Sequence, residues 1–157
     1  MQNKIKVGLI GAGHLGRYHI NHLSKHSDID FVGFFDTDQE NAKQVASKFS
    51  VKSFEGFNQL IDSVDAVHIV TPTNTHYEIA KKCLNKNKDV FIEKPITKNT
   101  KEACDIIDIA EKNNRIIQVG HIERFNPTIN HLKTVFAQPH YIEIERLAPF
   151  QSRGTEV

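Results

Sequence analysis

Short apolar runs alternate with amphipathic segments of helical period along the first 120 residues of this 157-residue chain. The apolar runs are nearly continuous, as in strands that are buried on both faces. This alternation predicts an α/β fold with a doubly wound parallel sheet, covered by helices on both faces. We predict strands near 4–10, 30–35, 66–70, 89–92 and 116–119, helices near 14–26, 38–48, 75–86 and 99–113, and short segments near 52–54 and 57–62.

The pattern changes after Gly120. A loop is predicted over 120–127, and a helix from about Pro127 to Ala137, because proline is favoured at the first position of a helix. Residues 140–147 alternate apolar and charged side chains, which predicts a strand with one face in water. We assign 1–120 to a Rossmann domain and 121–157 to a linker helix and the first strand of a second, antiparallel α/β domain. That strand lacks a hairpin partner, so we expect a truncated chain.

A glycine-rich turn joins the first predicted strand to the first predicted helix. Its sequence is Gly11-Ala12-Gly13-His14-Leu15-Gly16, and the next strand ends at Asp36. In a dinucleotide-binding turn, Gly11 permits the tight bend, Gly13 lets the backbone approach a pyrophosphate, and Gly16 lets the helix pack closely. The helix N-terminus offers unpaired N–H groups to phosphates. We therefore predict cofactor contacts from Gly11, Gly13, His14, Leu15 and Gly16.

Asp36 bears on which cofactor binds. A carboxylate at this position accepts hydrogen bonds from a ribose diol and repels a 2′-phosphate, and no arginine follows it to hold that phosphate. We therefore predict NAD, with NADP as the alternative. A parallel α/β domain whose glycine turn holds no nucleotide is the other interpretation.

A second polar segment, Thr71-Pro72-Thr73-Asn74-Thr75-His76, follows the strand at 66–70. Open α/β sheets bind ligands at the carboxyl ends of their strands. Thr71, Asn74 and His76 are therefore candidates for contacts to the ribose and nicotinamide side of a cofactor, in a loop stiffened by Pro72. Capping of the next helix by Asn74 or Thr75 is an equal alternative.

The segment Glu93-Lys94-Pro95 ends the strand at 89–92, at the same edge of the sheet. A lysine there can donate a hydrogen bond to a substrate hydroxyl, polarise a carbonyl as a hydride moves, and stabilise a developing alkoxide. Pro95 restricts the backbone and can adopt a cis bond, which would fix the direction of Lys94. A surface lysine in a strand-to-helix turn is the alternative.

Nine histidines are scattered along the chain. His19, His22 and His26 have helical spacing, but no carboxylate or cysteine completes a site, so we predict no metal. His68 lies inside an apolar strand and is predicted to be a hydrogen-bonded core residue. His121 is kept open as a ligand contact.

Composition excludes several classes of protein. The net charge is +1, which gives no electrostatic case for nucleic acid or membrane surfaces. No apolar run is long enough to span a bilayer, and Lys4 and Lys6 interrupt any signal peptide. Cys83 and Cys104 lack metal-ligand spacing and are expected as buried or half-buried free thiols in a reducing compartment. We expect a cytoplasmic protein.

Together these stretches resemble the N-terminal half of the Gfo/Idh/MocA family, which includes glucose–fructose oxidoreductase and inositol dehydrogenase. The matching stretches are the glycine turn with His19, Asp36, residues 71–76, residues 93–95, and Gly120-His121-Ile122-Glu123-Arg124-Phe125-Asn126-Pro127. The resemblance implies hydride transfer between NAD(P) and a sugar, cyclitol or nucleotide-sugar hydroxyl carbon. It makes Lys94 the catalytic lysine. It places Asn74, His76, Glu93 and Arg124 around the cofactor and active site.

The resemblance also implies what this chain lacks. Family proteins carry an aspartate and an acid–base histidine in the second domain, beyond residue 157. We therefore expect this chain alone to bind cofactor but to be inactive. The full-length form is expected to be a homo-oligomer that acts on a small sugar-like substrate. Residues 146–150 and 153–155 resemble the subgroup that acts on nucleotide-linked amino sugars.

Two other classes of function stay open. The first is a non-catalytic NAD(H)-binding module or redox sensor. The unpaired strand at 140–147 argues against it, because an exposed apolar edge favours aggregation. The second is a methyltransferase-type domain that binds another nucleotide, against which the segment Glu93-Lys94-Pro95 argues.

Overall fold

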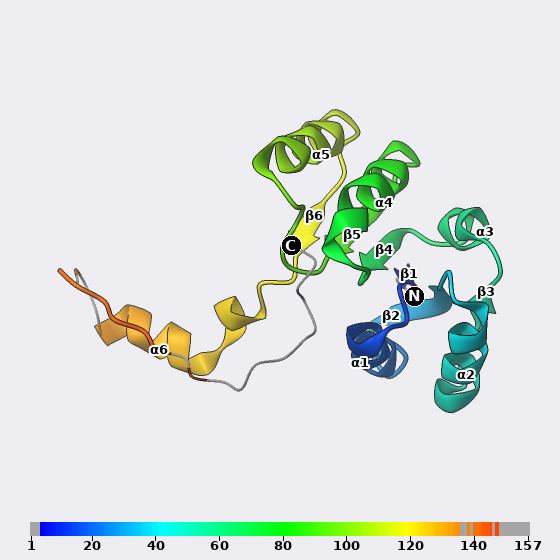
Figure 1. The fold of residues 1–157 in the computed structure, drawn as a ribbon, viewed down its shortest axis with the longest axis horizontal. Coiled ribbons are helices and arrows are strands. Elements are labelled where there is room, and N and C mark those ends of the chain that lie inside the picture. The colour runs from blue at the N-terminus through cyan, green and yellow to red at the C-terminus, as the bar shows by residue number, and fades with distance from the viewer. Residues whose placement is uncertain (1–3, 136–137, 139, 146, 148–157) are drawn as a thin grey trace. The chain divides into compact units, whose positions relative to one another are not determined.

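The computed structural model describes residues 4–135, 138, 140–145 and 147 (Figure 1). The chain divides into two compact units, Met1–Gly120 and His121–Val157. Each unit is described by itself below.

In its described residues, the first unit contains one sheet of six parallel strands. The strands are β1 (Ile5–Ile10), β2 (Ile29–Phe35), β3 (Ser53–Phe54), β4 (Ala66–Ile69), β5 (Asp89–Ile92) and β6 (Ile117–Val119). Their order in the sheet is β3-β2-β1-β4-β5-β6: from β1 the strands are added outward to β3 on one side, and from β4 to β6 on the other. The strand order therefore switches between β1 and β4, and ligands of open α/β sheets bind at such a switch point, beyond the carboxyl ends of the strands.

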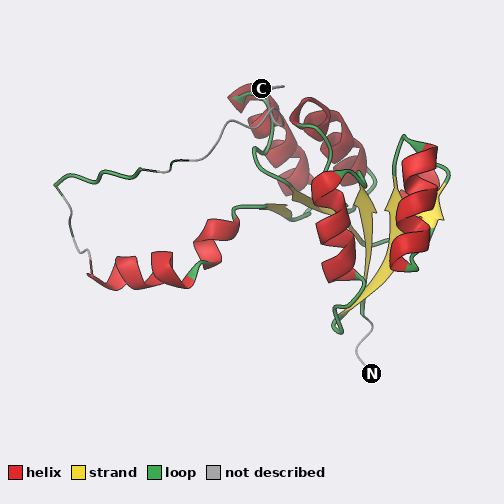
Figure 2. Cartoon of the chain, turned by 60° about the horizontal axis from the view of Figure 1, so that its bottom comes forward, coloured by secondary structure: helices red, strands yellow, loops and turns green. Residues whose placement is uncertain are grey.

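Helices cover both faces of this sheet (Figure 2). Successive strand residues point to opposite faces, and Leu9 and Ile10 accordingly belong to two different buried apolar clusters. The helices are α1 (His14–Leu23), α2 (Gln39–Phe49), α3 (Phe57–Asp62), α4 (Thr73–Asn85) and α5 (Thr100–Lys112). One cluster packs α1 and α2 on the sheet, and the other packs α3, α4 and α5. The predicted doubly wound α/β fold is confirmed.

Two helix boundaries differ from the prediction by more than one residue. Helix α1 ends at Leu23 rather than at residue 26, because the N–H groups of Lys25 and His26 bond carbonyls only three residues back, in a tightened turn. Helix α4 begins at Thr73, two residues early, with Pro72 at its N-cap and no side-chain capping bond. Asn74 and Thr75 therefore lie within the first turn of α4 instead of capping it.

The second unit contains a 3₁₀ helix, η1 (Ile122–Phe125), and α6 (Pro127–Val135). Helix α6 begins at Pro127 as predicted, and residues 136 and 137 lie outside the described residues. The strand predicted at 140–147 is wrong for residues 140–145 and 147, which have no strand structure; residue 146 lies outside the described part. Alternation shows which face of a strand can be buried, but a strand also needs a hydrogen-bonded neighbour.

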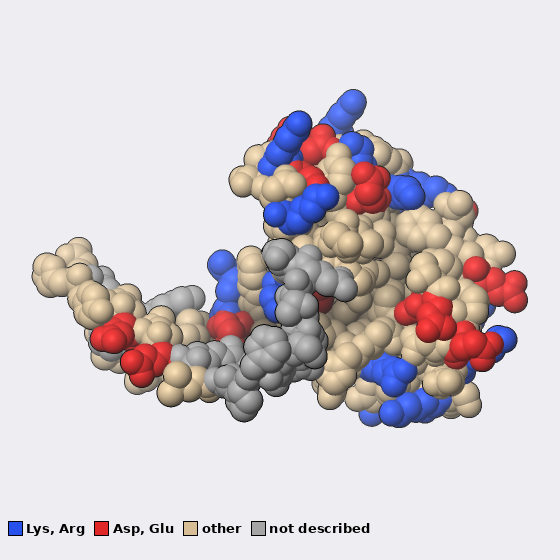
Figure 3. All heavy atoms as spheres, viewed as in Figure 1, with Lys and Arg blue, Asp and Glu red and all other residues tan. Residues whose placement is uncertain are grey.

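The expectation for the two cysteines is half right. Cys83 is buried in α4, but Cys104 is exposed on α5. The buried residues of α5 are Ile106 and Ala110, on one stripe, and Cys104 lies off it. Within the described ranges, no helix has the length and apolarity needed to cross a bilayer. Acidic and basic side chains are interspersed on the face shown in Figure 3.

Candidate functional site

The glycine turn between β1 and α1 contains two glycines that the protein's own packing requires. Gly11 has φ +93°, in the left-handed region, and a Cβ there would clash with the carbonyl oxygen of Val70. A Cβ at Gly16 would clash with the carbonyl oxygen of Gly11. The turn and the first turn of α1 therefore pack against each other closely enough to exclude even a methyl group.

Gly13 is different, because nothing lies within 4 Å of a Cβ built on it. Its φ of −66° is also accessible to any residue. Internal packing gives no reason for glycine here. The open space lies at the N-cap of α1, where backbone N–H groups attract phosphate. The residues present therefore fit a pyrophosphate at this position.

Asp36, just beyond the end of β2, is fixed by two backbone donors. The N–H of Ala12 donates to Asp36 Oδ2 over 2.6 Å, and the N–H of Asp38 donates to Oδ1 over 2.8 Å. An ionised carboxylate has about four acceptor sites, so it can still accept from a ribose diol. The first bond also holds the glycine turn against the end of β2.

Two side chains that the sequence analysis did not single out, those of Asn41 and Arg17, support the glycine turn. Asn41, on α2, donates from Nδ2 to the carbonyl oxygen of Ala12 over 3.2 Å, and it accepts from Arg17 of α1. The two residues stand 24 positions apart in the chain, so no local pattern reveals this contact.

A cavity of about 420 Å³ opens beside Asp36 and the glycine turn. Its size falls within the range of small-molecule sites. The lining includes Gly11, Gly13, Asp36, Thr71, Pro72 and Thr75. A cavity of about 560 Å³ lies elsewhere, lined by Lys4, Lys6, Ile29, Asp30 and Asp65 near the amino ends of strands. Size alone would select this second cavity, but only the first adjoins the glycine turn, and we place the site there.

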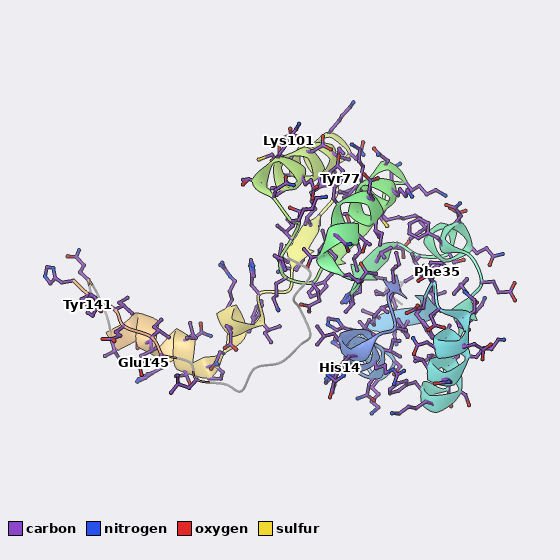
Figure 4. All side chains as sticks on the ribbon, viewed as in Figure 1. His14, Phe35, Tyr77, Lys101, Tyr141 and Glu145 are labelled. Atoms are coloured by element: carbon purple, nitrogen blue, oxygen red, sulfur yellow. The ribbon has the colours of Figure 1, made fainter. Side chains whose placement is uncertain are left out.

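The polar segment after β4 meets the cavity through Thr71, Pro72 and Thr75. The Thr75 hydroxyl lies 2.7 Å from both the Thr71 hydroxyl and the Pro72 carbonyl oxygen, which fixes this turn. Asn74 is exposed in the first turn of α4. His14, the first residue of α1, is also exposed (Figure 4). The centroid of its ring lies 5.4 Å from that of Tyr18, in an edge-on arrangement. Leu15 is 49% exposed.

His76 lies inside the protein, 1% exposed. Its Nδ1 is 2.9 Å from the carbonyl oxygen of Pro95, and its Nε2 is 2.8 Å from that of Thr71. Both ring nitrogens are thus engaged by the protein itself. The ring joins the loop after β4 to the loop after β5.

The Glu93-Lys94-Pro95 turn follows β5 directly. Lys94 is exposed, and its peptide bond to Pro95 is cis. The Glu93 side chain is 12% exposed; its Oε1 lies 3.1 Å from His19 Nε2, and its Oε2 accepts from the Lys94 N–H. A Cβ at Gly120 would lie 2.9 Å from Glu93 Oε1, so a glycine leaves room for this carboxylate.

His68, on β4, does not have the predicted set of hydrogen bonds. Its ring stacks on Phe91 with centroids 4.5 Å apart, and its buried Nδ1 has no hydrogen-bond partner among the described residues. Burial, with a smaller effect of His19, lowers the pKa of His68 to about 4. The prediction that His68 is hydrogen-bonded failed because its neighbour on β5, Phe91, is aromatic and offers no polar side-chain group.

The remaining candidates belong to the second unit. His121 is the N-cap of η1, and Arg124 lies in its last turn. Both are exposed. Their contact with a cofactor stays a prediction. No group of three or more histidine, cysteine or acidic residues suited to a metal is found in the described part of the chain.

The arrangement is that of a dinucleotide-binding domain, and comparison with known proteins agrees. The profile of the oxidoreductase family with an NAD-binding Rossmann fold matches residues 5–121. The chain belongs to this family, Gfo/Idh/MocA.

Several named dehydrogenases are similar to the chain. The UDP-N-acetylglucosamine 3-dehydrogenase of Acidithiobacillus ferrooxidans is 38% identical over 154 residues, which are 98% of this chain and 49% of that protein. The glucose-6-phosphate 3-dehydrogenase of Bacillus subtilis is 35% identical over 130 residues, 83% of this chain and 37% of that protein. The chain thus spans about half or less of the length of these curated relatives.

Solved structures agree on the fold. A structure of the Acidithiobacillus ferrooxidans enzyme superposes with a TM-score of 0.89 at 38% identity, covering 99% of this chain and 51% of that one. A dehydrogenase structure from Clostridium difficile gives a TM-score of 0.80 at 28% identity, covering 84% of this chain and 44% of that one.

Proposed function

We propose that this chain is the cofactor-binding part of an NAD(P)-dependent oxidoreductase acting on a sugar, cyclitol or nucleotide-sugar hydroxyl carbon. In this proposal, residues 1–120 bind the dinucleotide and 121–157 begin the substrate domain. The observation that carries it is the open space at Gly13, beside the fixed carboxylate of Asp36. Open space at the N-terminus of α1 and a carboxylate able to bond a ribose, both at one cavity, suit a dinucleotide.

The cofactor would be held from two turns. The backbone at Gly13 and the N-terminus of α1 would face the pyrophosphate, and Asp36 would bond the adenosine ribose. Thr71, Pro72 and Thr75 line the same cavity, and they would contact the cofactor from the other side. Asp36 favours NAD over NADP, because its negative charge would repel a 2′-phosphate.

When bound, the cofactor supplies the nicotinamide carbon that accepts or returns a hydride. Lys94 is the residue we propose as catalytic. Its exposed side chain follows β5 at the carboxyl edge of the sheet, and an ammonium there would donate to the substrate oxygen and stabilise negative charge on it. The proton-accepting group would come from beyond residue 157.

Nucleotide sugars are the substrate class we favour. The support is the 38% identity with the UDP-N-acetylglucosamine 3-dehydrogenase, which extends over nearly the whole of this chain. Hexose phosphates and inositols are the competing substrates, since dehydrogenases of both kinds are among the relatives. The active form would be a homo-oligomer of the longer protein.

The test starts with the protein purified from its native cells. Intact mass shows whether the native product is larger than 17.9 kDa. That product is then assayed for NADH formation with UDP-N-acetylglucosamine, glucose 6-phosphate and myo-inositol. The matched variants are Lys94→Ala and Lys101→Ala, the second removing an exposed lysine of α5.

We expect the native protein to turn over one of the three substrates. Lys94→Ala should abolish this turnover and Lys101→Ala should leave it unchanged, and both variants should still bind NADH. Turnover that survives in Lys94→Ala would refute the proposed role of this residue. A native product of 17.9 kDa that binds NADH but oxidises none of the three substrates would favour a non-catalytic module.

A further inference from the structure

The residues on either side of Lys94 are each bonded to a histidine from a different helix. On one side, His76 of α4 bonds the carbonyl oxygen of Pro95 at 2.9 Å. On the other side, His19 of α1 bonds the Glu93 carboxylate at 3.1 Å. The turn that carries Lys94 is therefore held at both ends.

The His76 contact leaves little freedom for movement. The side chain is buried, and its second nitrogen lies 2.8 Å from the Thr71 carbonyl oxygen. Carbonyl oxygens only accept and a neutral imidazole carries one N–H, so a neutral ring donates to one of these two oxygens and packs against the other. A displacement of the Thr71 loop would thus be passed directly to Pro95.

The His19 contact is similarly confined. Its ring packs against Phe91 and His68, with centroids 5.7 and 5.8 Å away. Glu93 accepts from His19 with one oxygen and from the Lys94 N–H with the other. Gly120 leaves room for the carboxylate in this position, because a Cβ at residue 120 would lie 2.9 Å from Glu93 Oε1.

We propose that His19 and His76 are positioning residues that fix Lys94 relative to the cofactor. The inference rests on the proposed role of Lys94. Helix α1 begins at the glycine turn and α4 begins at the Pro72 turn, and both turns line the cavity assigned to the cofactor. Helices α1 and α4 would thus contact the cofactor at their N-termini. Each would also hold the turn of Lys94 through a histidine further along the helix.

The experiment measures how well NADH protects Lys94 from acetylation in this chain. The wild-type chain and the variants His19→Gln, His76→Gln and His22→Gln are treated with an N-hydroxysuccinimide acetate, with and without saturating NADH. Peptide mass spectrometry gives the rate at Lys94 and, as an internal reference, at Lys101. His22 is exposed on α1, so its variant is the matched control.

Thermal unfolding of each variant sets a temperature at which all chains are folded. The half-buried His19 provides a variant that tests the inference even if the His76 variant does not fold. The variant Ile106→Val, which changes a buried residue of α5, tests whether a loss of stability by itself alters how well NADH protects Lys94 from acetylation. A merely structural role of the histidines would make their variants behave like Ile106→Val.

NADH should slow acetylation of Lys94, and not of Lys101, in the wild-type chain, His22→Gln and Ile106→Val. In His19→Gln and His76→Gln, the protection of Lys94 should fall roughly two- to tenfold, as expected for loss of one hydrogen bond. Full protection in the folded His19 or His76 variant would overturn the role of that histidine. A wild-type chain that binds NADH without protecting Lys94 would instead refute the proposed catalytic role of Lys94, and the inference with it.

Discussion

The backbone N–H of Ala12 donates a 2.6 Å hydrogen bond to the carboxylate of Asp36, which joins the glycine turn to the end of β2. The contact spans 24 residues of sequence. This hydrogen bond holds Asp36, which would bind the ribose, against the glycine turn, which would bind the phosphates. Recognition of the cofactor by these residues would therefore depend on one preformed unit.

Replacing Asp36 with Asn should weaken NADH binding and narrow the preference for NADH over NADPH. The amide keeps a similar shape, but it loses the charge that would strengthen bonds to the ribose and repel a 2′-phosphate, and it can accept from only one of the two backbone N–H groups of Ala12 and Asp38. The loss for NADH should be about 1.5–3 kcal/mol, the value of hydrogen bonds to charged groups. Fluorescence titration with both dinucleotides measures it. Asp108→Asn, at an exposed position on α5, is the control, and an unchanged NADH/NADPH ratio in Asp36→Asn would contradict the assignment.

Gly16→Ala should destabilise the fold. The added methyl group would clash with the Gly11 carbonyl oxygen, and backbone cannot move aside as a flexible side chain does. Overpacking of this kind costs about 1–3 kcal/mol or more. Urea unfolding measures the change, with Gly56→Ala as the control because a Cβ there meets only ordinary contacts beyond 3.6 Å. Equal midpoints for the two variants would show that the turn is looser than described.

The two cysteines should differ strongly in reactivity. Burial raises the pKa of the Cys83 thiol to about 12, whereas Cys104 is exposed. The thiolate is the reactive form, so at pH 8 iodoacetamide should label Cys104 alone until the chain unfolds. Mass spectrometry with and without urea reads both sites. Labelling of Cys83 at the rate of Cys104 in the folded chain would contradict its burial.

Stability should fall at acidic pH partly because of His68. Its pKa is lowered to about 4 in the folded protein, from an ordinary value of 6.5. Between these two pKa values the unfolded chain binds a proton that the folded chain does not. The contribution of His68 to the free energy of unfolding is therefore fully present above about pH 6.5 and is lost as the pH falls towards 4. The upper limit of this effect is about 3 kcal/mol.

The variant His68→Phe keeps an aromatic ring beside Phe91 and removes the titration. Its unfolding free energy should therefore depend less on pH between 4.5 and 7 than that of the wild-type chain or of His22→Gln. Urea unfolding at both pH values gives the comparison. Identical pH dependence in all three chains would exclude His68 as the source.

The sequence predicts the fold well because its signals are local. A buried strand needs a continuous apolar run, and a tight strand-to-helix turn needs glycine, as at Gly11 and Gly16. Both features can be recognised within a few residues of sequence. The switch point and the cavity then follow from the order of the strands.

The contacts that organise the site were harder to predict. His19 and Glu93 are 74 residues apart, and only the fold brings them together. His76 was expected at the ligand, yet the structure places it between two backbone carbonyl groups, an environment that no sequence pattern specifies. The strand expected at 140–147 failed for the same reason, since pairing depends on a partner and not on its own alternation.

Titration of this chain and its Gly13→Ala variant with NADH tests the central claim most directly. Nothing in the protein opposes a methyl group at residue 13, so the variant should unfold at the same temperature as the wild-type chain or above it. If the open space there holds the cofactor pyrophosphate, the wild-type chain binds NADH saturably and the folded variant binds it much more weakly. Equal binding by the two chains, or no binding by the wild-type chain, would contradict the account.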